Sequence, residues 1–203
     1  MKSICVIGSG ISGSTIANLL SKKYKVDVYE KAKGIGGRSS HRRYLNKLGF
    51  DHGLQYISPK TSKFKKFCSG LQKKRVLKKW QGPHNFDHSK VLENKKHTKL
   101  IGAKGNNAIS KYLLKNINCI FGYELFKIER IKKNWKLSFL NGDVKYYEIL
   151  IISIPFAQSK KLLKKFLPNF FKNKKVKMEA NITVMTVTNK IKNNFSSFLF
   201  NDE

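Results

Sequence analysis

Two hydrophobic periodicities follow each other at the start of the chain. Ile4 to Ile7 form an unbroken apolar run, which is long enough for a buried parallel strand. Between Ile11 and Leu20 the apolar residues recur with helical spacing, and Lys25 to Tyr29 form a second apolar-rich run. The pattern predicts a strand, a helix and a second strand, which is the order of a βαβ unit.

Glycines fill the turn between the first predicted strand and the helix. Gly8, Gly10 and Gly13 have the spacing G-x-G-x-x-G, and Glu30 closes the second strand. In such a turn Gly8 permits the sharp bend, Gly10 lets a pyrophosphate approach the backbone, and Gly13 lets the helix pack closely on the strand. A glycine-rich turn also occurs in other α/β proteins, but the agreement of all these parts favours a dinucleotide-binding unit of the Rossmann type.

The helix N-terminus and Glu30 suit two different parts of a dinucleotide, the pyrophosphate and a ribose. Free N–H groups and a partial positive charge at the start of the helix favour the pyrophosphate. Glu30 is placed to accept hydrogen bonds from ribose hydroxyls, while its charge disfavours a 2′-phosphate. We therefore expect FAD or NAD rather than NADP.

The second half of the chain predicts a β-meander. Tyr123–Ile131 and Trp135–Leu140 alternate as strands, and Asn141-Gly142 is a signal for a type I′ hairpin turn. Val144–Tyr147 returns from that turn, and Glu148–Ile154 runs into a buried strand that Pro155 ends.

Three further segments carry secondary-structure signals. Residues 59–99 contain possible helix anchors at Phe64, Phe67, Leu71, Val76 and Trp80, and Ile101–Leu114 predicts a glycine turn followed by a helix. Phe156–Leu167 predicts a basic amphipathic helix, whose apolar face either lies on an anionic membrane or, as is more common, packs on the protein's own core. Asn181–Thr188 predicts a strand.

A second glycine loop follows Glu30. Gly34, Gly36 and Gly37 allow it to fold back over the nucleotide, and Arg38 offers a guanidinium group to a phosphate. The stretches E-K-x-x-G-x-G-G-R-S and F-D-H-G-x-Q-Y, from Glu30 and from Phe50, resemble the flavin amine oxidase superfamily. Within it the chain is most similar to the renalase-like FAD-dependent oxidoreductases of bacteria. The similarity continues at Trp80 and in residues 101–109 and 151–158.

The resemblance implies an α/β fold, with a Rossmann-like FAD-binding domain, a β-meander and a partial α+β substrate domain. The FAD-binding domain would comprise residues 1–58 and 100–158, and the substrate domain residues 59–99 and 159–203. Renalase-like proteins are longer, so the resemblance also implies that this sequence lacks their C-terminal part. Contacts to adenosine and pyrophosphate should then be more complete than contacts to the isoalloxazine ring.

The resemblance also implies FAD and a set of cofactor-binding residues, and we expect the FAD to be non-covalent because nothing around the cysteines indicates covalent attachment. The binding residues are Gly8, Gly10, Ile11, Ser12 and Gly13 at the pyrophosphate, Glu30 and Lys31 at the adenosine ribose, Gly37 and Arg38 at the phosphates or ribityl chain, and Gly53, Gln55 and Tyr56 on the flavin side. His52 either faces the flavin or anchors its turn by hydrogen bonds.

The expected function is hydride transfer from a small reduced substrate, of the amine or reduced nicotinamide type, to flavin N5. No catalytic side chain is indicated, because a flavin carries the redox chemistry and the protein mainly positions the substrate. Two alternatives stay open. The chain is either a truncated, non-catalytic dinucleotide-binding protein, or a basic binder of nucleic acid or membrane surfaces with a Rossmann core.

Charge makes the last alternative worth weighing. The formal net charge is +30, with 42 Lys and Arg against 12 Asp and Glu. Lysines outnumber arginines and occur in almost every segment, whereas specific recognition of nucleic acid leans on Arg. We therefore expect a lysine-rich surface that attracts anionic ligands, and no specific nucleic-acid partner.

The remaining signals are negative. No apolar run is long enough to span a membrane, and glycines interrupt the apolar start too early for a signal peptide, so we expect a cytoplasmic protein. Three widely spaced cysteines, Cys5, Cys68 and Cys119, indicate no disulfide framework. His84 and His88 have the spacing of one helix face but lack a third ligand, so no metal site is expected.

Overall fold

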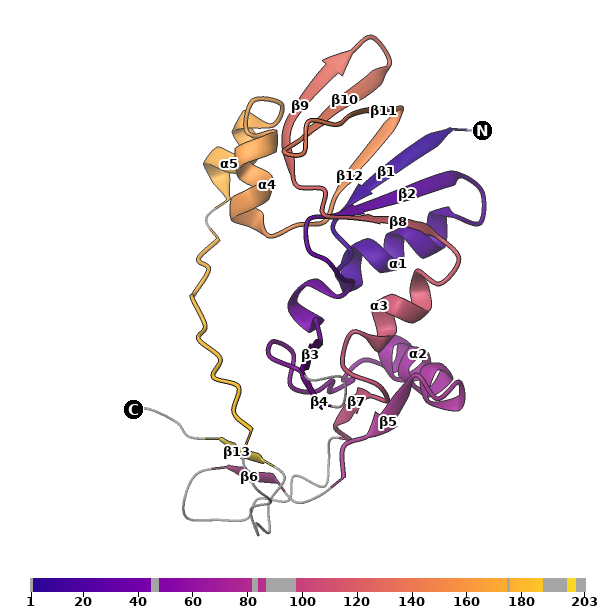
Figure 1. Ribbon diagram of the computed structural model, residues 1–203, viewed down its shortest axis with the longest axis vertical. Helices are drawn as coiled ribbons and strands as arrows, with labels where there is room; N and C mark the ends of the chain where they lie inside the picture. The colour runs from indigo at the N-terminus through magenta and orange to yellow at the C-terminus, as the bar shows by residue number, and fades with distance from the viewer. Residues whose placement is uncertain are drawn as a thin grey trace.

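A four-stranded parallel sheet forms the centre of the computed structural model, which describes residues 2–44, 48–81, 84–86, 98–174, 176–187 and 197–199. Its strand order is β12 (Ile149–Ile152), β1 (Ser3–Ile7), β2 (Lys25–Glu30) and β8 (Asn118–Phe121). Figure 1 shows this sheet between the helix α1 (Ile11–Leu20) on one side and the meander on the other. The predicted strand–helix–strand unit is confirmed, with β1 and β2 each one residue longer than expected.

Both faces of β1 are buried, which explains why its sequence is apolar without alternation. Ile4 and Val6 belong to a core that includes Ala17 of α1. Cys5 and Ile7 point to the opposite face and belong to a core shared with the meander. The sheet is thus covered on both sides, as in other α/β proteins with parallel sheets.

The meander consists of β9 (Leu125–Ile131), β10 (Asn134–Phe139) and β11 (Val144–Tyr147), paired antiparallel in that order. The predicted hairpin is confirmed, but its type I′ turn is wrong. Gly142 donates its N–H to the Phe139 carbonyl at 3.0 Å, so Leu140 and Asn141 are the central residues of that turn. Only Gly142, beyond them, has a positive φ, of 89°. A type I′ turn would require positive φ at both central residues.

The predicted basic helix, Phe156–Leu167, is shorter than expected: it is present as α4 (Phe156–Leu163), and a separate helix, α5 (Pro168–Asn173), follows it. The residue before Pro168 is Leu167, which has a φ of −133°, because a following proline disfavours the helical conformation. Leu162, Leu163 and Phe166 pack on the core of the meander. The apolar face of α4 therefore covers the protein's own core, which was the more common of the two expectations.

The lower part of Figure 1 contains β3 (Arg42–Tyr44), β4 (Leu48–Phe50), α2 (Ser62–Lys73), β5 (Leu77–Lys79), β6 (His84–Phe86), β7 (Leu100–Gly102), α3 (Ala108–Leu113) and β13 (Ser197–Leu199). The short helix η1 (Gly37–Ser39) precedes β3 in the chain. A third core joins α2, β5, β7 and α3 and is formed by Ile57, Cys68, Leu71, Leu77, Leu100, Ile109 and Leu113. Strand β5 pairs antiparallel with β7, and β6 pairs parallel with β13.

Helix α2 begins at the N-cap Thr61, whose side chain accepts a hydrogen bond from the Phe64 N–H at 3.3 Å. Leu71 faces the third core, but the Phe64 and Phe67 side chains are more than a third exposed. The expected anchors Val76 and Trp80 follow the helix rather than belonging to it. The helix was therefore predicted correctly, but its buried face was not.

The predicted strand Asn181–Thr188 is wrong over the residues described. Residues 176–187 run extended along the left of Figure 1 and belong to no described strand or sheet. Thr188 lies outside the described residues. Ile182 is 91% exposed, and the Thr183 hydroxyl donates to the His52 carbonyl at 2.9 Å. Apolar alternation alone does not make a strand, because the backbone groups also need a neighbouring strand to pair with.

Candidate dinucleotide-binding site

Gly8 and Gly13 are required by the packing of the protein itself. Gly8 has a φ of 101° and donates its N–H to the Tyr29 carbonyl at 2.8 Å, so the turn ties β1 to β2. A Cβ atom on Gly13 would overlap the Gly8 carbonyl oxygen and the Ser153 hydroxyl. The sharp bend at Gly8 and the close packing at Gly13 are both confirmed.

Gly10 differs from these two glycines. Its φ of −67° is open to any residue, and a Cβ atom there would meet protein atoms only at ordinary contact distance, 3.9 Å from the Gly36 carbonyl oxygen. Gly10 is also the N-cap of α1, and no side chain caps the helix. The protein's own packing therefore does not demand a glycine here, whereas a phosphate approaching the first N–H groups of α1 would.

The second glycine loop folds onto the first. Gly36 donates its N–H to the Ser9 carbonyl at 3.2 Å and forms an isolated bridge with Gly10. A Cβ atom on Gly37, which has a φ of 55°, would lie 3.2 Å from the Gly10 Cα atom. Arg38 follows within η1 and is exposed. Its guanidinium group forms no hydrogen bond or ion pair with any other part of the chain that the structure describes.

Glu30 is buried and already holds the turn. Its Oε2 atom accepts hydrogen bonds from both the N–H and the hydroxyl of Ser9, each at 2.8 Å, and Oε1 accepts from the Ala32 N–H at 2.9 Å. A carboxylate has about four acceptor positions. Glu30 therefore has one position left for a ribose hydroxyl, and its first task is to fix the glycine turn.

The other residues predicted to bind the cofactor near the first glycine turn, Ile11, Ser12 and Lys31, lie at the surface. Ile11 is 38% exposed and Ser12 is exposed, both at the start of α1. The Lys31 ammonium group lies 4.0 Å from a carboxylate oxygen of Glu124, at the start of the meander. These three residues border the glycine turn and leave their outer surfaces accessible to a ligand.

Gly53 and Leu54 contact the second glycine loop at Arg38. A Cβ atom on Gly53 would overlap the Arg38 carbonyl oxygen, and this oxygen accepts the Leu54 N–H at 2.9 Å. Gln55 is exposed, and the Tyr56 ring centroid lies 5.7 Å from that of Trp80. The structure therefore brings Arg38 and the F-D-H-G-x-Q-Y motif together.

Lys99 completes this aromatic corner. Its ammonium group lies 4.7 Å from the Tyr56 ring centroid and 6.0 Å from that of Trp80. Burial lowers the pKa of Lys99 below its ordinary value. Tyr56 and Trp80 were noted in the sequence, whereas Lys99 carried no motif that would have identified it.

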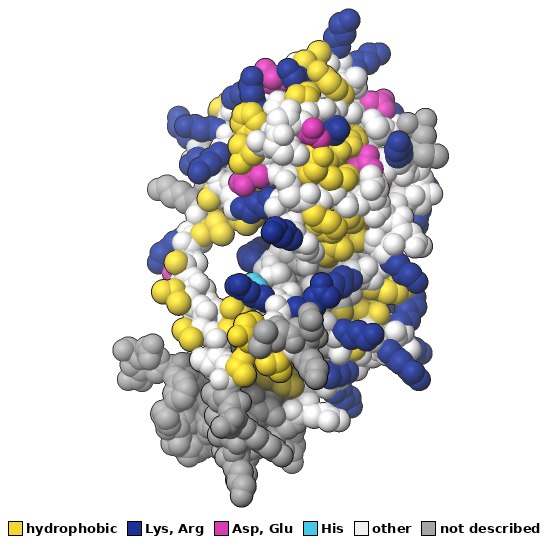
Figure 2. All heavy atoms as spheres, viewed as in Figure 1, with side chains coloured by type: hydrophobic (Ala, Val, Ile, Leu, Met, Phe, Trp, Pro, Cys, Tyr) yellow, Lys and Arg dark blue, Asp and Glu magenta, His cyan; other side chains and the backbone are white. Residues whose placement is uncertain are grey.

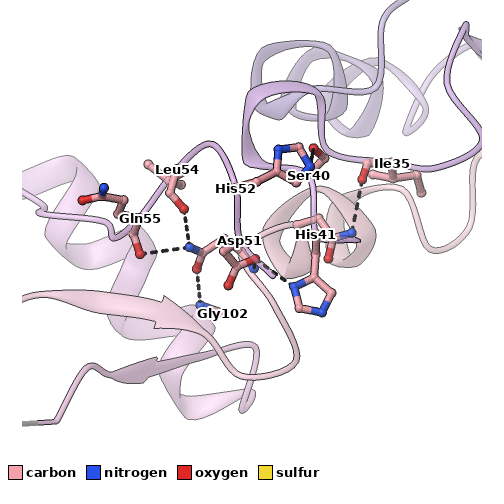
Figure 3. A network of polar contacts seen from close by, with 10 residues as sticks. Ile35, Ser40, His41, Asp51, His52, Leu54, Gln55 and Gly102 are labelled. Carbon is pink, nitrogen blue, oxygen red and sulfur yellow. Dashed lines mark hydrogen bonds and ion pairs between the residues drawn. The ribbon is translucent and has the colours of Figure 1, made fainter. Parts of the chain in front are cut away.

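Three polar residues that support the site were missed in the sequence. Ser9 links the first turn to Glu30, and Ser153 donates its hydroxyl to the Ile7 and Gly8 carbonyls at 2.8 and 3.1 Å. Asn106 ties the segment after Gly53 to β7, through hydrogen bonds to Leu54 and Gly102 that Figure 3 marks as dashed lines at those labelled residues. Ser153 and Asn106 lie in stretches that carried the family resemblance, so their position was noted but their role was not.

His52 anchors its turn rather than standing free. Its Nε2 atom lies 3.2 Å from the Ser40 hydroxyl, and its carbonyl accepts the Thr183 hydroxyl. The hydrogen-bonded anchor, one of the two roles considered for His52, is therefore confirmed, while its orientation toward a flavin stays a prediction. His84 lies in β6 rather than on a helix, and His88 lies outside the described residues.

Neither the distribution of surface charge nor any grouping of possible metal ligands in the described residues points to a second kind of site. Figure 2 shows Lys and Arg side chains scattered over the visible face from top to bottom rather than gathered in one stripe. Within the described ranges, no three His, Cys, Asp or Glu residues are grouped so that they could hold a metal ion. No helix in these ranges has the length and apolar character needed to cross a membrane.

Comparison with known proteins supports a Rossmann-like fold. Residues 6–71 match the family described as NAD(P)-binding Rossmann-like domain, and this range contains both glycine loops and Glu30. Over 80% of its length the chain is structurally similar to the tetracycline destructase Tet(51), with a TM-score of 0.54 and 15% sequence identity. The match covers 41% of the length of that protein. The chain is thus an α/β protein with a parallel sheet and a Rossmann-like domain, while the similarity to renalase-like proteins stays a prediction.

Proposed function

We propose that the chain binds FAD along its two glycine loops and serves as part of an FAD-dependent oxidoreductase. The observation that carries this proposal is the difference between Gly10 and its neighbours. Gly8 and Gly13 are explained by packing, but Gly10 leaves space in front of an uncapped helix at the carboxyl ends of parallel strands. In open α/β sheets ligands bind at this edge.

The residues present fit FAD in three respects. The free acceptor position of Glu30 suits a ribose hydroxyl, and its buried negative charge disfavours a 2′-phosphate. Arg38 offers an exposed guanidinium group beside both glycine loops. The hydrogen bond from Leu54 to the Arg38 carbonyl then connects this end to Gly53, Gln55 and Tyr56. These contacts link the two groups of residues, and the cofactor path that we propose, for a ligand longer than a mononucleotide, runs along them.

The bound flavin would supply hydride acceptance at N5 from a small reduced substrate, of the amine or reduced nicotinamide type, and would pass the electrons to O₂ or another acceptor. The chain's own residues would bind and orient the cofactor. Gly8 to Gly13 would hold the pyrophosphate, with Ile11 and Ser12 at its edge. Glu30 and Lys31 would lie at the adenosine ribose, and Gly37 and Arg38 at the phosphates or the ribityl chain.

The first test is the visible absorption spectrum of the purified chain after FAD is added and the excess removed. We expect retained absorption of oxidised flavin in the wild type and its loss in Gly10→Asp, which places a carboxylate where phosphate would lie. Gly70→Asp is the matched control, because Gly70 lies in α2 with open space around its Cα atom. Equal loss in both variants would contradict the proposed position of the cofactor.

A second pair of variants tests the phosphate contact. We expect Arg38→Ala to weaken FAD binding about tenfold or more, since a charged hydrogen bond to phosphate is lost. Arg130→Ala, which removes an exposed guanidinium group 5.1 Å from the Trp135 ring centroid, should leave the affinity unchanged. A folded wild type that binds NADH but no FAD would replace the proposal by a nicotinamide site. Retained flavin that no amine or reduced nicotinamide bleaches without oxygen would favour a non-catalytic dinucleotide-binding protein.

A further inference from the structure

We infer that Asn106 is a positioning residue that holds the segment Gly53–Tyr56 in place for the flavin end of the cofactor, an inference that rests on the proposed function. Asn106 is 1% exposed, among the most completely buried polar side chains of the chain. A buried amide is costly unless its donors and acceptor are satisfied. Its partners therefore show what it holds.

The amide group of Asn106 joins two segments that are far apart in the sequence. Its nitrogen donates to the carbonyls of Leu54 and Gln55, at 2.6 and 3.1 Å, while its oxygen accepts the Gly102 N–H at 2.8 Å. In Figure 3 the dashed lines that end at Leu54, Gln55 and Gly102 mark these three hydrogen bonds. One side chain thus fixes two successive carbonyls of the segment against the end of β7.

The main chain of Asn106 is held in turn by Asp51. Oδ1 of Asp51 accepts the Asn106 N–H at 2.8 Å and lies 2.9 Å from Nδ1 of His41. The His41 imidazole fits between Gly49 and Gly105, because a Cβ atom on either glycine would overlap the ring. His41, Asp51 and Asn106 therefore form one connected set beneath the segment Gly53–Tyr56.

The two ends of the segment are fixed separately. Leu54 donates its N–H to the Arg38 carbonyl at 2.9 Å, and Ile57 exchanges hydrogen bonds with Leu100 at 2.7 and 2.8 Å. Between these anchors, Asn106 is what holds the Leu54 and Gln55 carbonyls inward. Gln55 and Tyr56 are the residues expected on the flavin side, so a loose segment would misplace them without disturbing the glycine turn.

The first experiment needs no cofactor. In Asn106→Asp the acceptor for Gly102 stays, whereas both donations to the segment are lost. We expect hydrogen exchange of the Leu54 and Ile57 amides to accelerate about tenfold or more, with less than about a twofold change in β1. Asn18→Asp is the matched control, since it removes a similar amide donation, to the Leu113 carbonyl at 2.7 Å.

The second experiment compares FAD with ADP, which lacks the flavin. We expect Asn106→Asp to weaken FAD binding about tenfold and to change the visible circular dichroism of bound flavin, while ADP affinity changes less than about twofold. Asn18→Asp should leave both ligands and the flavin spectrum unchanged. A purely structural role of Asn106 would lower both affinities together.

The outcomes separate this inference from the proposed function. If the wild type binds neither ADP nor FAD, the proposed function fails. If the hydrogen-exchange rates of the Leu54 and Ile57 amides are unchanged in Asn106→Asp, the positioning role is overturned, whatever the wild type binds. If the wild type binds FAD and Asn106→Asp shows the same affinity ratio and flavin spectrum, only the positioning role is overturned. Should Asn106→Asp not fold, Asn106→Ser, which retains a hydroxyl donor, replaces it in both experiments with the same expected directions.

Discussion

The two ends of the proposed cofactor path are built in different ways. The upper end is continuous in sequence, because β1, the glycine turn, α1, β2 and Glu30 all lie within residues 3–30. The lower end assembles Arg38, Asp51, the segment Gly53–Tyr56 and Asn106 from separate stretches. The comparison teaches that the order of elements along the chain suffices to place the first glycine turn, whereas the segment proposed to face the flavin depends on contacts between distant segments.

The largest expected effect comes from comparing two glycines, Gly13 and Gly53, at each of which an added Cβ atom would overlap a backbone carbonyl oxygen. A Cβ atom on Gly13 would overlap the Gly8 carbonyl oxygen, and one on Gly53 would overlap the Arg38 carbonyl oxygen. We expect Gly13→Ala to lower the free energy of unfolding by about 3 kcal/mol or more, because the helix cannot move off the sheet. Gly53→Ala should cost about 1–2 kcal/mol, since its segment can shift.

Urea denaturation followed by far-UV circular dichroism measures both free energies. Gly10→Ala is the control within the upper end, and its stability should stay within about 1 kcal/mol of the wild type, because its Cβ atom would meet nothing closer than 3.9 Å. Equal losses for Gly13→Ala and Gly53→Ala would show that the two ends are equally rigid and would break the comparison.

An effect of intermediate size should appear at high pH in the upper half of the molecule. The Tyr147 hydroxyl donates to Asp27 Oδ2 at 2.8 Å and lies 2.9 Å from the Tyr29 hydroxyl. Burial, helped by these hydrogen bonds, raises the pKa of Tyr147 far above its ordinary value. The unfolded chain then releases a proton above pH about 10 while the folded chain retains it, so stability falls as the pH rises through this range, by about 1.4 kcal/mol per pH unit.

The measurement is the free energy of unfolding between pH about 9 and 11, compared with that of Tyr147→Phe. The variant should be less stable at neutral pH but should lose less stability per pH unit. Tyr44→Phe serves as the control, because Tyr44 is 49% exposed in β3 and its slope should match that of the wild type. Identical slopes for Tyr147→Phe and wild type would contradict the prediction.

The smallest effect is expected in the extended segment 176–187. Ile182→Ser should change the free energy of unfolding by less than about 0.5 kcal/mol, because a side chain that is 91% exposed loses no burial. Val28→Ser, at a fully buried position of β2, is the contrasting substitution and should cost several times more. Both values come from urea denaturation, and a large loss for Ile182→Ser would mean that this segment contributes to a core.

The predicted elements were most accurate where local signals agreed. The run Ile4–Ile7, the glycine spacing and the Asn-Gly hairpin each placed an element correctly, because strand, turn and helix preferences pointed the same way. One error occurs where a partner decides the outcome. The strand expected at Asn181–Thr188 has no neighbouring strand over its described residues. The helix expected over Phe156–Leu167 is an error of another kind, because α4 ends at Leu163 and Leu167 precedes a proline, which is a local effect.

The same division holds for the candidate site. Gly8, Gly10, Gly13 and Glu30 could be named from the sequence, since a pyrophosphate turn needs them at fixed spacing within one βαβ unit. The spacing could not show that Glu30 accepts three hydrogen bonds from Ser9 and Ala32, which leaves one acceptor position on its carboxylate.

The sequence by itself determined the Rossmann-like unit, because its βαβ order, glycine spacing and closing acid are all encoded within about thirty consecutive residues. Only the tertiary structure decided which residues support the segment Gly53–Tyr56. The hydrogen bonds of Asn106 reach residues about fifty positions away, at separations of 52 and 51 for Leu54 and Gln55. Periodicity describes neighbours along the chain, whereas a buried amide is placed by whichever distant backbone groups must be satisfied once the chain has folded.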